Sequence, residues 1–165
     1  MSSQIIHGAV TITSLKQCFL LTAVYGLHII DDRRGLWEEL LILNTTILDL
    51  WLVFGGFKAM TCLEDRASGN PVHEYEVHDF NKYIITAGMI ELRGIGRWFT
   101  WTNGYVYSKI DRALVNAAWT VRLEQNEVMV MDPGCSDHTP LSVQFTEEEV
   151  QRPKPFRFLN CLSVH

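Results

Sequence analysis

The sequence predicts an α/β domain in which strands and helices are mixed and the sheets are largely antiparallel or mixed. Many short apolar runs lie close together along the 165 residues, and two longer segments have the spacing of amphipathic helices. A strict alternation of strand and helix is absent, as is a glycine-rich phosphate loop, which excludes a dinucleotide-binding fold. The hydrophobic content of 47% and charged content of 20% are those of an ordinary globular protein with a core.

The first third is expected to contain two strands and one helix. Residues 5–13 alternate apolar and polar side chains, as a half-buried strand does. Residues 19–25 are more continuously apolar, which is typical of a strand buried on both faces, and Gly26 ends the run. Apolar residues recur at helical spacing over residues 35–48, which predicts an amphipathic helix.

The middle third is expected to add a buried strand and a second helix. The strand is residues 51–54 (WLVF), which lead into Gly55-Gly56 and then a polar loop at 58–72. Residues 77–87 have an apolar face at helical spacing. A short link at 89–92 and a turn marked by Gly94 and Gly96 are expected to follow.

In the last third, Asn103-Gly104 is a hairpin signal between residues 98–102 and 108–115, which are expected to pair with each other. The remaining expected elements are a helical turn at 116–123, a strand at 128–131, a loop at 132–140 and a strand at 141–145.

Acidic and imidazole side chains stand between these last apolar runs. Asp111 precedes one run, and Asp137-His138 lies in the polar loop before another. A carboxylate can hold a divalent metal, an imidazole can donate to a phosphoryl oxygen, and a second acid can set the tautomer of that imidazole. An Asp-His pair in a polar turn is by itself more often a solvated loop, so the interpretation depends on the flanking stretches.

Charge, cysteine content and hydropathy argue against several classes of function. The net charge of −5 argues against tight, non-specific binding of nucleic acid. The four cysteines are widely spaced, which predicts neither a zinc site nor a disulfide framework and fits a reduced intracellular compartment, cytoplasmic or nuclear. We expect no signal peptide at the N-terminus and no membrane span, because the apolar stretch 40–57 is interrupted by polar residues.

Other residues have two interpretations. Trp98, Trp101 and Trp119 can stack on bases, but core positions are favoured. Arg33-Arg34 can touch a phosphate backbone, but a solvated loop beside two acids is favoured. The other histidines are scattered and are not expected to form a metal site.

Several motifs occur in a characteristic order. They are VYG (24–26), WLVFGGF (51–57), FTWTNG (99–104), KIDRALVN followed by Trp119 (109–119), SDHTPL (136–141) and FRFLN (156–160). From about residue 4 to 165, the chain resembles the endonuclease/exonuclease/phosphatase superfamily. More narrowly, it is similar to the endonuclease domain of plant LINE-type (non-LTR) retrotransposons.

The resemblance implies a DNase I-like, four-layer α/β sandwich that hydrolyses phosphodiesters in DNA with Mg²⁺. It places Tyr25 near the phosphate and makes Asp111 the acid that orients a histidine. It places Asp137 and His138 on the family's Asp-His pair, with Asp137 as a metal position.

Two departures fall in the family's Gly-Asp-Phe-Asn box, where Gly56 replaces the Asp and Lys58 replaces the Asn. Glycine has no side chain to take a proton or bind a cation, and lysine cannot accept a hydrogen bond and adds a positive charge. The family's N-terminal Asn and metal-binding Glu have no counterpart here. We therefore expect a vestigial site, no tight Mg²⁺ binding, no cleavage, and weak or no DNA binding.

The resemblance also predicts the domain limits: residues 1–146 are a partial, N-terminally truncated domain, and 147–165 are a charged and aromatic tail or linker. We expect the truncation to leave an apolar sheet edge that favours self-association or aggregation. Two alternatives remain open. One is a non-cleaving nucleic-acid-binding or interaction module in which Lys58 replaces the metal's charge. The other is a residual phosphodiesterase that uses Tyr25, Asp111, Asp137 and His138.

Overall fold

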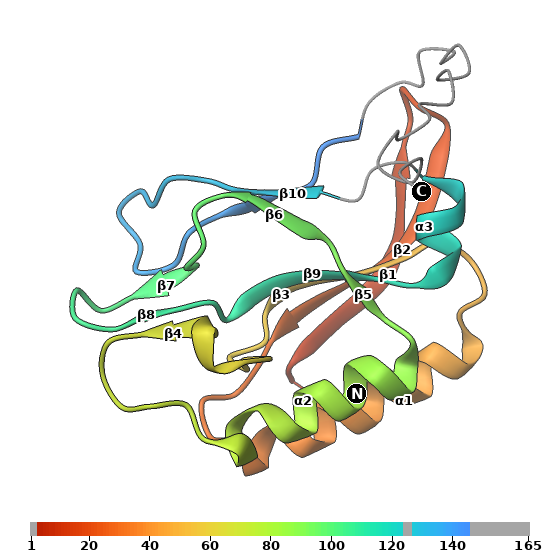
Figure 1. Cartoon of the computed structure of the whole chain (residues 1–165). Helices are drawn as coiled ribbons and strands as arrows, with labels where there is room; N and C mark the ends of the chain where they lie inside the picture. The colour runs from red at the N-terminus through yellow and green to blue at the C-terminus, as the bar shows by residue number, and fades with distance from the viewer. Residues whose placement is uncertain (1–2, 124–126, 146–165) are drawn as a thin grey trace, which may run out of the picture.

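The computed structural model describes residues 3–123 and 127–145 and has a mixed α/β architecture (Figure 1). The strands are β1 (Ile5–Ile12), β2 (Gln17–Tyr25), β3 (Trp51–Gly56), β4 (Arg66–Ala67), β5 (Ile90–Glu91), β6 (Arg93–Gly96), β7 (Trp101–Thr102), β8 (Tyr107–Ser108), β9 (Asp111–Val115), β10 (Glu127–Val130) and β11 (Leu141–Ser142). The helices are α1 (Arg34–Thr46), α2 (Glu74–Ala87) and α3 (Ala117–Arg122), with short 3-10 turns η1 (Asp31–Arg33) and η2 (Leu63–Asp65).

A five-stranded sheet in the order β1-β2-β3-β9-β5 forms the centre of the domain. β1 and β2 form an antiparallel hairpin, β2 and β3 are parallel, and β9 is antiparallel to both β3 and β5. The parallel step is possible because the 35–48 segment folds as the crossover helix α1 between β2 and β3. The sheet is thus mixed and largely antiparallel, as expected.

Alternation along the central strands divides the core into two clusters. Trp51 and Val53 of β3 face α1 and α2, whereas Leu52 faces the opposite side with Ala113 and Val115 of β9. The two helices lie together across one face of the sheet (Figure 1). On the other face, α3 and the three-stranded sheet β11-β10-β6 complete the second cluster. The described residues therefore form layers in the order helix, sheet, sheet.

Local sequence signals explain where the two long helices lie. Leu36 and Leu40 are four residues apart in α1 and are completely buried, as their helical spacing predicts. In α2, the Glu76 side chain accepts a hydrogen bond from the His73 backbone amide at the N-terminus. Gly88 ends α2 in the left-handed conformation with φ of 62°.

Several expected elements need correction. Gly94 and Gly96 are not a turn but lie in β6, which pairs with β10, and the 89–92 link contains β5. Gly96 indicated a turn, but it lies in a strand with a φ of 100°. Glycine is needed there because an added Cβ would overlap the Val130 carbonyl oxygen. The 58–72 loop contains η2 and β4.

The hairpin around Asn103-Gly104 is shorter than expected. Only β7 and β8 pair across it, and β9 instead joins the central sheet beside β3. The apolar run of β9 lies between two sheet neighbours, β3 and β5. The hairpin signal is local and gives no information about these partners. The strand at 141–145 is assigned only over Leu141–Ser142, and β2 is not buried on both faces, since Ala23 and Tyr25 are exposed.

Two side-chain expectations are also wrong. Trp119 is buried as expected, but Trp98 is 55% exposed and its ring lies under the Lys109 ammonium. Arg33 was expected in a solvated loop and is only 4% exposed. Within the described residues, no helix is both long and apolar enough to cross a membrane. The acidic run at 147–149 and the basic, aromatic segment at 152–160 lie outside the described residues.

Candidate functional site

The ends of three neighbouring strands bring the candidate residues together. Tyr25 at the end of β2 pairs with Gly56 at the end of β3, and Gly56 pairs with Asp111 at the start of β9. Because directly opposed residues in a sheet share a face, the Asp111 side chain lies beside the position where a Gly56 side chain would project. A Cβ built on Gly56 would lie 3.0 Å from Asp111 Oδ1.

The glycines around this point differ in what the backbone requires. A Cβ on Gly26 would overlap the Phe57 carbonyl, and Gly55 has a φ of 133° and would overlap the Val24 carbonyl. Gly56 has neither constraint, since Asp111 Oδ1 alone lies within 4 Å of the added atom. Glycine is therefore structurally required at 26 and 55 but not at 56.

His138 and Asp111 are in direct contact. His138 Nδ1 lies 2.9 Å from Asp111 Oδ2 and 3.1 Å from Oδ1. An ionised carboxylate only accepts hydrogen bonds, so Nδ1 donates and Nε2 is left for another partner. The side chains of Asp111 and His138 are 12% and 34% exposed, so the imidazole is the solvent-facing member of the pair.

Two strand contacts hold this pair in place. The Thr100 hydroxyl accepts from the backbone amides of Ile110 and Asp111 at 3.0 and 2.9 Å, which fixes the start of β9. His138 forms an isolated bridge with Trp101, and the Thr139 amide donates to the Thr100 carbonyl at 2.7 Å. The Thr102 amide donates to the Asp137 carbonyl at 3.0 Å, so the polar 132–140 loop is attached to residues 100–102 on both sides of the imidazole.

The Asp137 carboxylate has different partners from the adjacent imidazole. Its Oδ2 accepts from Trp101 Nε1 at 2.9 Å, and its Oδ1 accepts from the Ser136 hydroxyl at 3.4 Å. The indole hydrogen bond lowers the pKa of Asp137 below its usual value, so the carboxylate is ionised at neutral pH. The anion is exposed and lies beside the pair rather than within it.

Lys58 lies two residues after Gly56, the last residue of β3. Its φ of 50° is in the left-handed region, and its amide donates to the Ile110 carbonyl at 3.3 Å. The Lys58 ammonium is 4.8 Å from the centre of the Tyr25 ring, within cation–π distance. Tyr25 is 66% exposed, so this cation covers an aromatic face that otherwise contacts solvent.

These donor groups do not fit a tightly held hard cation. Mg²⁺ prefers several oxygen ligands, whereas position 56 offers none and position 58 supplies an ammonium. Among residues 3–123 and 127–145, no three His, Cys, Asp or Glu side chains converge as a metal site. The arrangement can accept or donate a proton at His138 and can place a positive charge at Lys58.

Sequence reasoning missed a buried charged network behind the site. The Arg112 side chain, fully buried, donates to Asp65 and to Glu91 Oε2, the latter at 2.7 Å, and Lys109 also contacts Glu91 at 2.7 Å. Burial alone would raise the pKa of Asp65, but Arg112 and the Thr61 and Cys62 donors outweigh it and lower the pKa. Arg112 lies at a strongly apolar stretch of β9, and an arginine inside such a run is the signal that could have indicated the network.

Arg33 was also missed as a buried residue that shapes the site. Its guanidinium donates to the carbonyls of Leu27, His28 and Lys58. Burial lowers the pKa of Arg33. Because it connects the loop after β2 with the Lys58 carbonyl, two residues beyond β3, Arg33 positions the backbone that carries Lys58.

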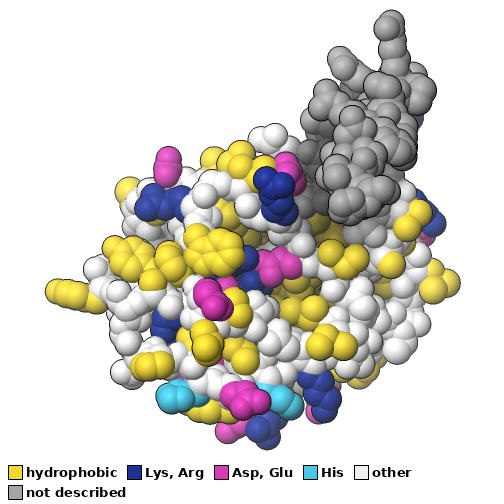
Figure 2. Space-filling model, viewed as in Figure 1, with side chains coloured by type: hydrophobic (Ala, Val, Ile, Leu, Met, Phe, Trp, Pro, Cys, Tyr) yellow, Lys and Arg dark blue, Asp and Glu magenta, His cyan; other side chains and the backbone are white. Residues whose placement is uncertain are grey.

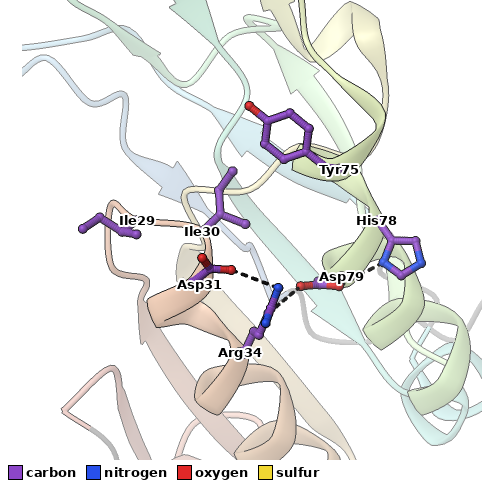
Figure 3. A pocket seen from close by; sticks show the side chains of 7 residues that line it. All are labelled: Ile29, Ile30, Asp31, Arg34, Tyr75, His78 and Asp79. Atoms are coloured by element: carbon purple, nitrogen blue, oxygen red, sulfur yellow. Dashed lines mark hydrogen bonds and ion pairs between the residues drawn. The ribbon is translucent and has the colours of Figure 1, made fainter.

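A separate surface hollow of about 420 Å³ lies between η1, the start of α1 and α2 (Figure 3). Tyr25, Asp111, Asp137 and His138 do not line it. Arg34 contacts Asp31 at 2.9 Å and Asp79 at 3.5 Å, and His78 contacts Asp79 at 2.9 Å. The charged side chains that line this hollow pair with one another, and the candidate residues lie elsewhere on the molecule.

Comparison with known proteins gives matches by structure. No family model matches the chain, and no curated protein matches its sequence. The 3′ phosphatase NExo from Neisseria, in a structure with a product DNA hairpin, superposes with a TM-score of 0.63 and 18% identity over 87% of this chain. A functionally unknown conserved protein from Enterococcus faecalis gives a TM-score of 0.53 and 18% identity over 87% of this chain. CdtB, the biologically active subunit of cytolethal distending toxin, gives a TM-score of 0.45 and 11% identity over 86%.

The matched region spans 65% of the NExo chain and 56% of the Enterococcus chain. At these identities the likeness concerns the fold. The chain therefore has the mixed α/β fold of the DNase I-like proteins.

Proposed function

We propose that this chain is a catalytically silent DNase I-like domain, derived from a retrotransposon-type, Mg²⁺-dependent DNA endonuclease of the plant LINE class. The observation that supports the loss of activity is the pairing of Gly56 with Asp111. The Asp111–His138 pair is intact at 2.9 Å, yet the position directly opposite the acid has no side chain.

Two chemical tasks are unfilled in this arrangement. In the family that the chain resembles, the residue at position 56 is the carboxylate that activates water. Loss of a general base lowers the catalytic rate by roughly 10²–10⁴-fold. The residue at position 58 is the amide that positions the nucleophile, and Lys58 lies over Tyr25 instead. A carboxylate at 137 that already accepts from Trp101 and Ser136 is a weak ligand for Mg²⁺ by itself.

A nicking assay on supercoiled plasmid tests this proposal. The full chain is incubated with Mg²⁺ beside a His138→Ala variant purified in the same way. We expect equal, background conversion to open circles for both proteins. Conversion by the wild-type chain that His138→Ala abolishes would contradict the proposal and would assign residual phosphodiesterase activity to Tyr25, Asp111, Asp137 and His138.

A second candidate function is metal-free binding of nucleic acid without cleavage. The Lys58 ammonium, held over the exposed Tyr25 ring, favours it, because this cation can contact a phosphate where the family uses a metal. The charge distribution opposes tight binding: basic and acidic side chains are interspersed on the face shown in Figure 2, and the net charge is −5.

A gel-shift titration at low salt separates the two candidates. Binding through this site predicts a shift that weakens with salt and is reduced by Lys58→Ala, whereas Lys16→Ala, on the distant β1–β2 turn, leaves it unchanged. A missing shift at low salt removes the second candidate and leaves the silent remnant. We also propose a cytoplasmic or nuclear location, which is supported by the free, exposed thiols of Cys18 and Cys135.

A further inference from the structure

Strand β1 has the features of an unprotected sheet edge. Among residues 3–123 and 127–145 it is outermost in the order β1-β2-β3-β9-β5, and its antiparallel pairing with β2 continues over eight residues without a bulge. Edge strands are normally protected by charges, proline or bulges. β1 reads IIHGAVTI, and the sequence has no Asp, Glu, Lys, Arg or Pro before Lys16.

The hydrogen-bond pattern shows which backbone groups point outward. The Tyr25 amide donates to the Gln4 carbonyl, so Gln4 and Tyr25 are a hydrogen-bonded pair of the β1–β2 ladder. Hydrogen-bonded pairs alternate along an antiparallel ladder. The even-numbered residues of β1 therefore bond to β2, and the outward amides and carbonyls belong to Ile5, His7, Ala9 and Thr11.

We propose that two copies of this chain pair through β1, antiparallel, about a two-fold axis at Gly8. Ile5 then lies opposite Thr11 of the second copy, and His7 opposite Ala9. All four outward-facing residues of each strand exchange main-chain hydrogen bonds in this register. The axis is perpendicular to the sheet, so the α1–α2 layers of both copies lie on the same side and the two five-stranded sheets become continuous.

Side chains support the same register. Ile6 is 79% exposed, although it lies in an apolar strand. The proposed pairing places it directly opposite Val10 of the second copy, whose side chain is partly buried against the core. Opposed residues at a non-hydrogen-bonded position are close, so this contact covers Ile6 in both copies.

The assembly closes as a dimer. Pairing uses the β1 edge of both copies, and the other edge of the central sheet is β5, which has two residues. Glu91 of β5 is engaged with Lys109 and Arg112, so a charged network protects that edge. Growth into longer sheets is therefore disfavoured.

Light scattering and sedimentation of the full chain over a concentration series test the proposal. We expect a monomer–dimer equilibrium in which Ile6→Lys raises the dissociation constant at least about tenfold. Ile85→Lys is the matched control, because Ile85 on α2 is also 79% exposed. A monomer at every concentration, species larger than a dimer, or equal weakening by Ile85→Lys would each overturn the proposal.

Disulfide trapping tests the register separately. A Cβ on Gly8 meets nothing within 4 Å, so Gly8→Cys in a Cys18→Ser background should fold. The two-fold axis brings the two introduced thiols together, and mild oxidation should give a covalent dimer faster than Ala9→Cys does in the same background. Faster trapping by Ala9→Cys would contradict the register.

Discussion

Replacing Gly56 with aspartate should destabilise the folded protein by adding a second carboxylate beside Asp111. The two positions are directly opposite in β3 and β9, and a Cβ at 56 already lies 3.0 Å from Asp111 Oδ1. Two carboxylates about 5 Å apart repel by about 3 kcal/mol at an effective dielectric constant of 20. Partial solvent exposure screens this repulsion, so we expect a loss of about 1–2 kcal/mol.

Gly56→Asn separates charge from shape, because asparagine has the same size and no charge. Urea unfolding at pH 7 should show Gly56→Asp less stable than Gly56→Asn by about 1–2 kcal/mol. The difference should shrink at acidic pH, because protonation of a carboxylate removes the repulsion between two close like charges. Equal stability of the two variants, or a more stable Gly56→Asp, would refute the geometry assigned to Gly56 and Asp111.

Other predictions concern the backbone, the core and the buried charges. Lys58→Asn should raise the unfolding free energy by about 0.5–1 kcal/mol in urea titrations, because asparagine tolerates the left-handed φ of 50° better than lysine. Tyr83→Phe should raise the melting temperature, since the buried Tyr83 hydroxyl has no hydrogen-bond partner among the described residues and such a group costs about 1–3 kcal/mol. Arg112→Met should cost about 3–5 kcal/mol by leaving the Asp65 carboxylate buried and unpaired. Wild-type stability should fall as the pH drops below about 4, because the folded-state pKa of Asp65 is lowered. Arg112→Met should weaken this dependence, since it removes the charge that lowers the Asp65 pKa most while the Thr61 and Cys62 donors remain.

Local periodicity was sufficient to predict the central elements of the fold. Helical spacing of apolar residues located α1, and alternation located β1, because each signal depends on side chains only a few positions apart. Sheet partners were harder to predict. β9 pairs with β3 rather than with the strand across the nearby hairpin turn, and that choice depends on two core clusters that form only in three dimensions.

For the candidate site, too, the sequence predicted some residues and not others. The motifs located Asp111 and His138, and the structure brings the two side chains into contact. The buried environments of Arg33 and Arg112 could not be predicted from local pattern, because arginine is usually exposed and its burial here depends on partners 25 and 47 positions away. The placement of Lys58 over Tyr25 likewise depends on the sheet register.

Calorimetric titration with Mg²⁺ tests most directly whether the candidate site lacks the groups that would hold a cation. With Gly56 lacking a side chain and Lys58 over Tyr25, we expect no saturable Mg²⁺ binding below about 1 mM. Saturable submillimolar Mg²⁺ binding by the wild-type chain that Asp137→Asn removes would contradict the account.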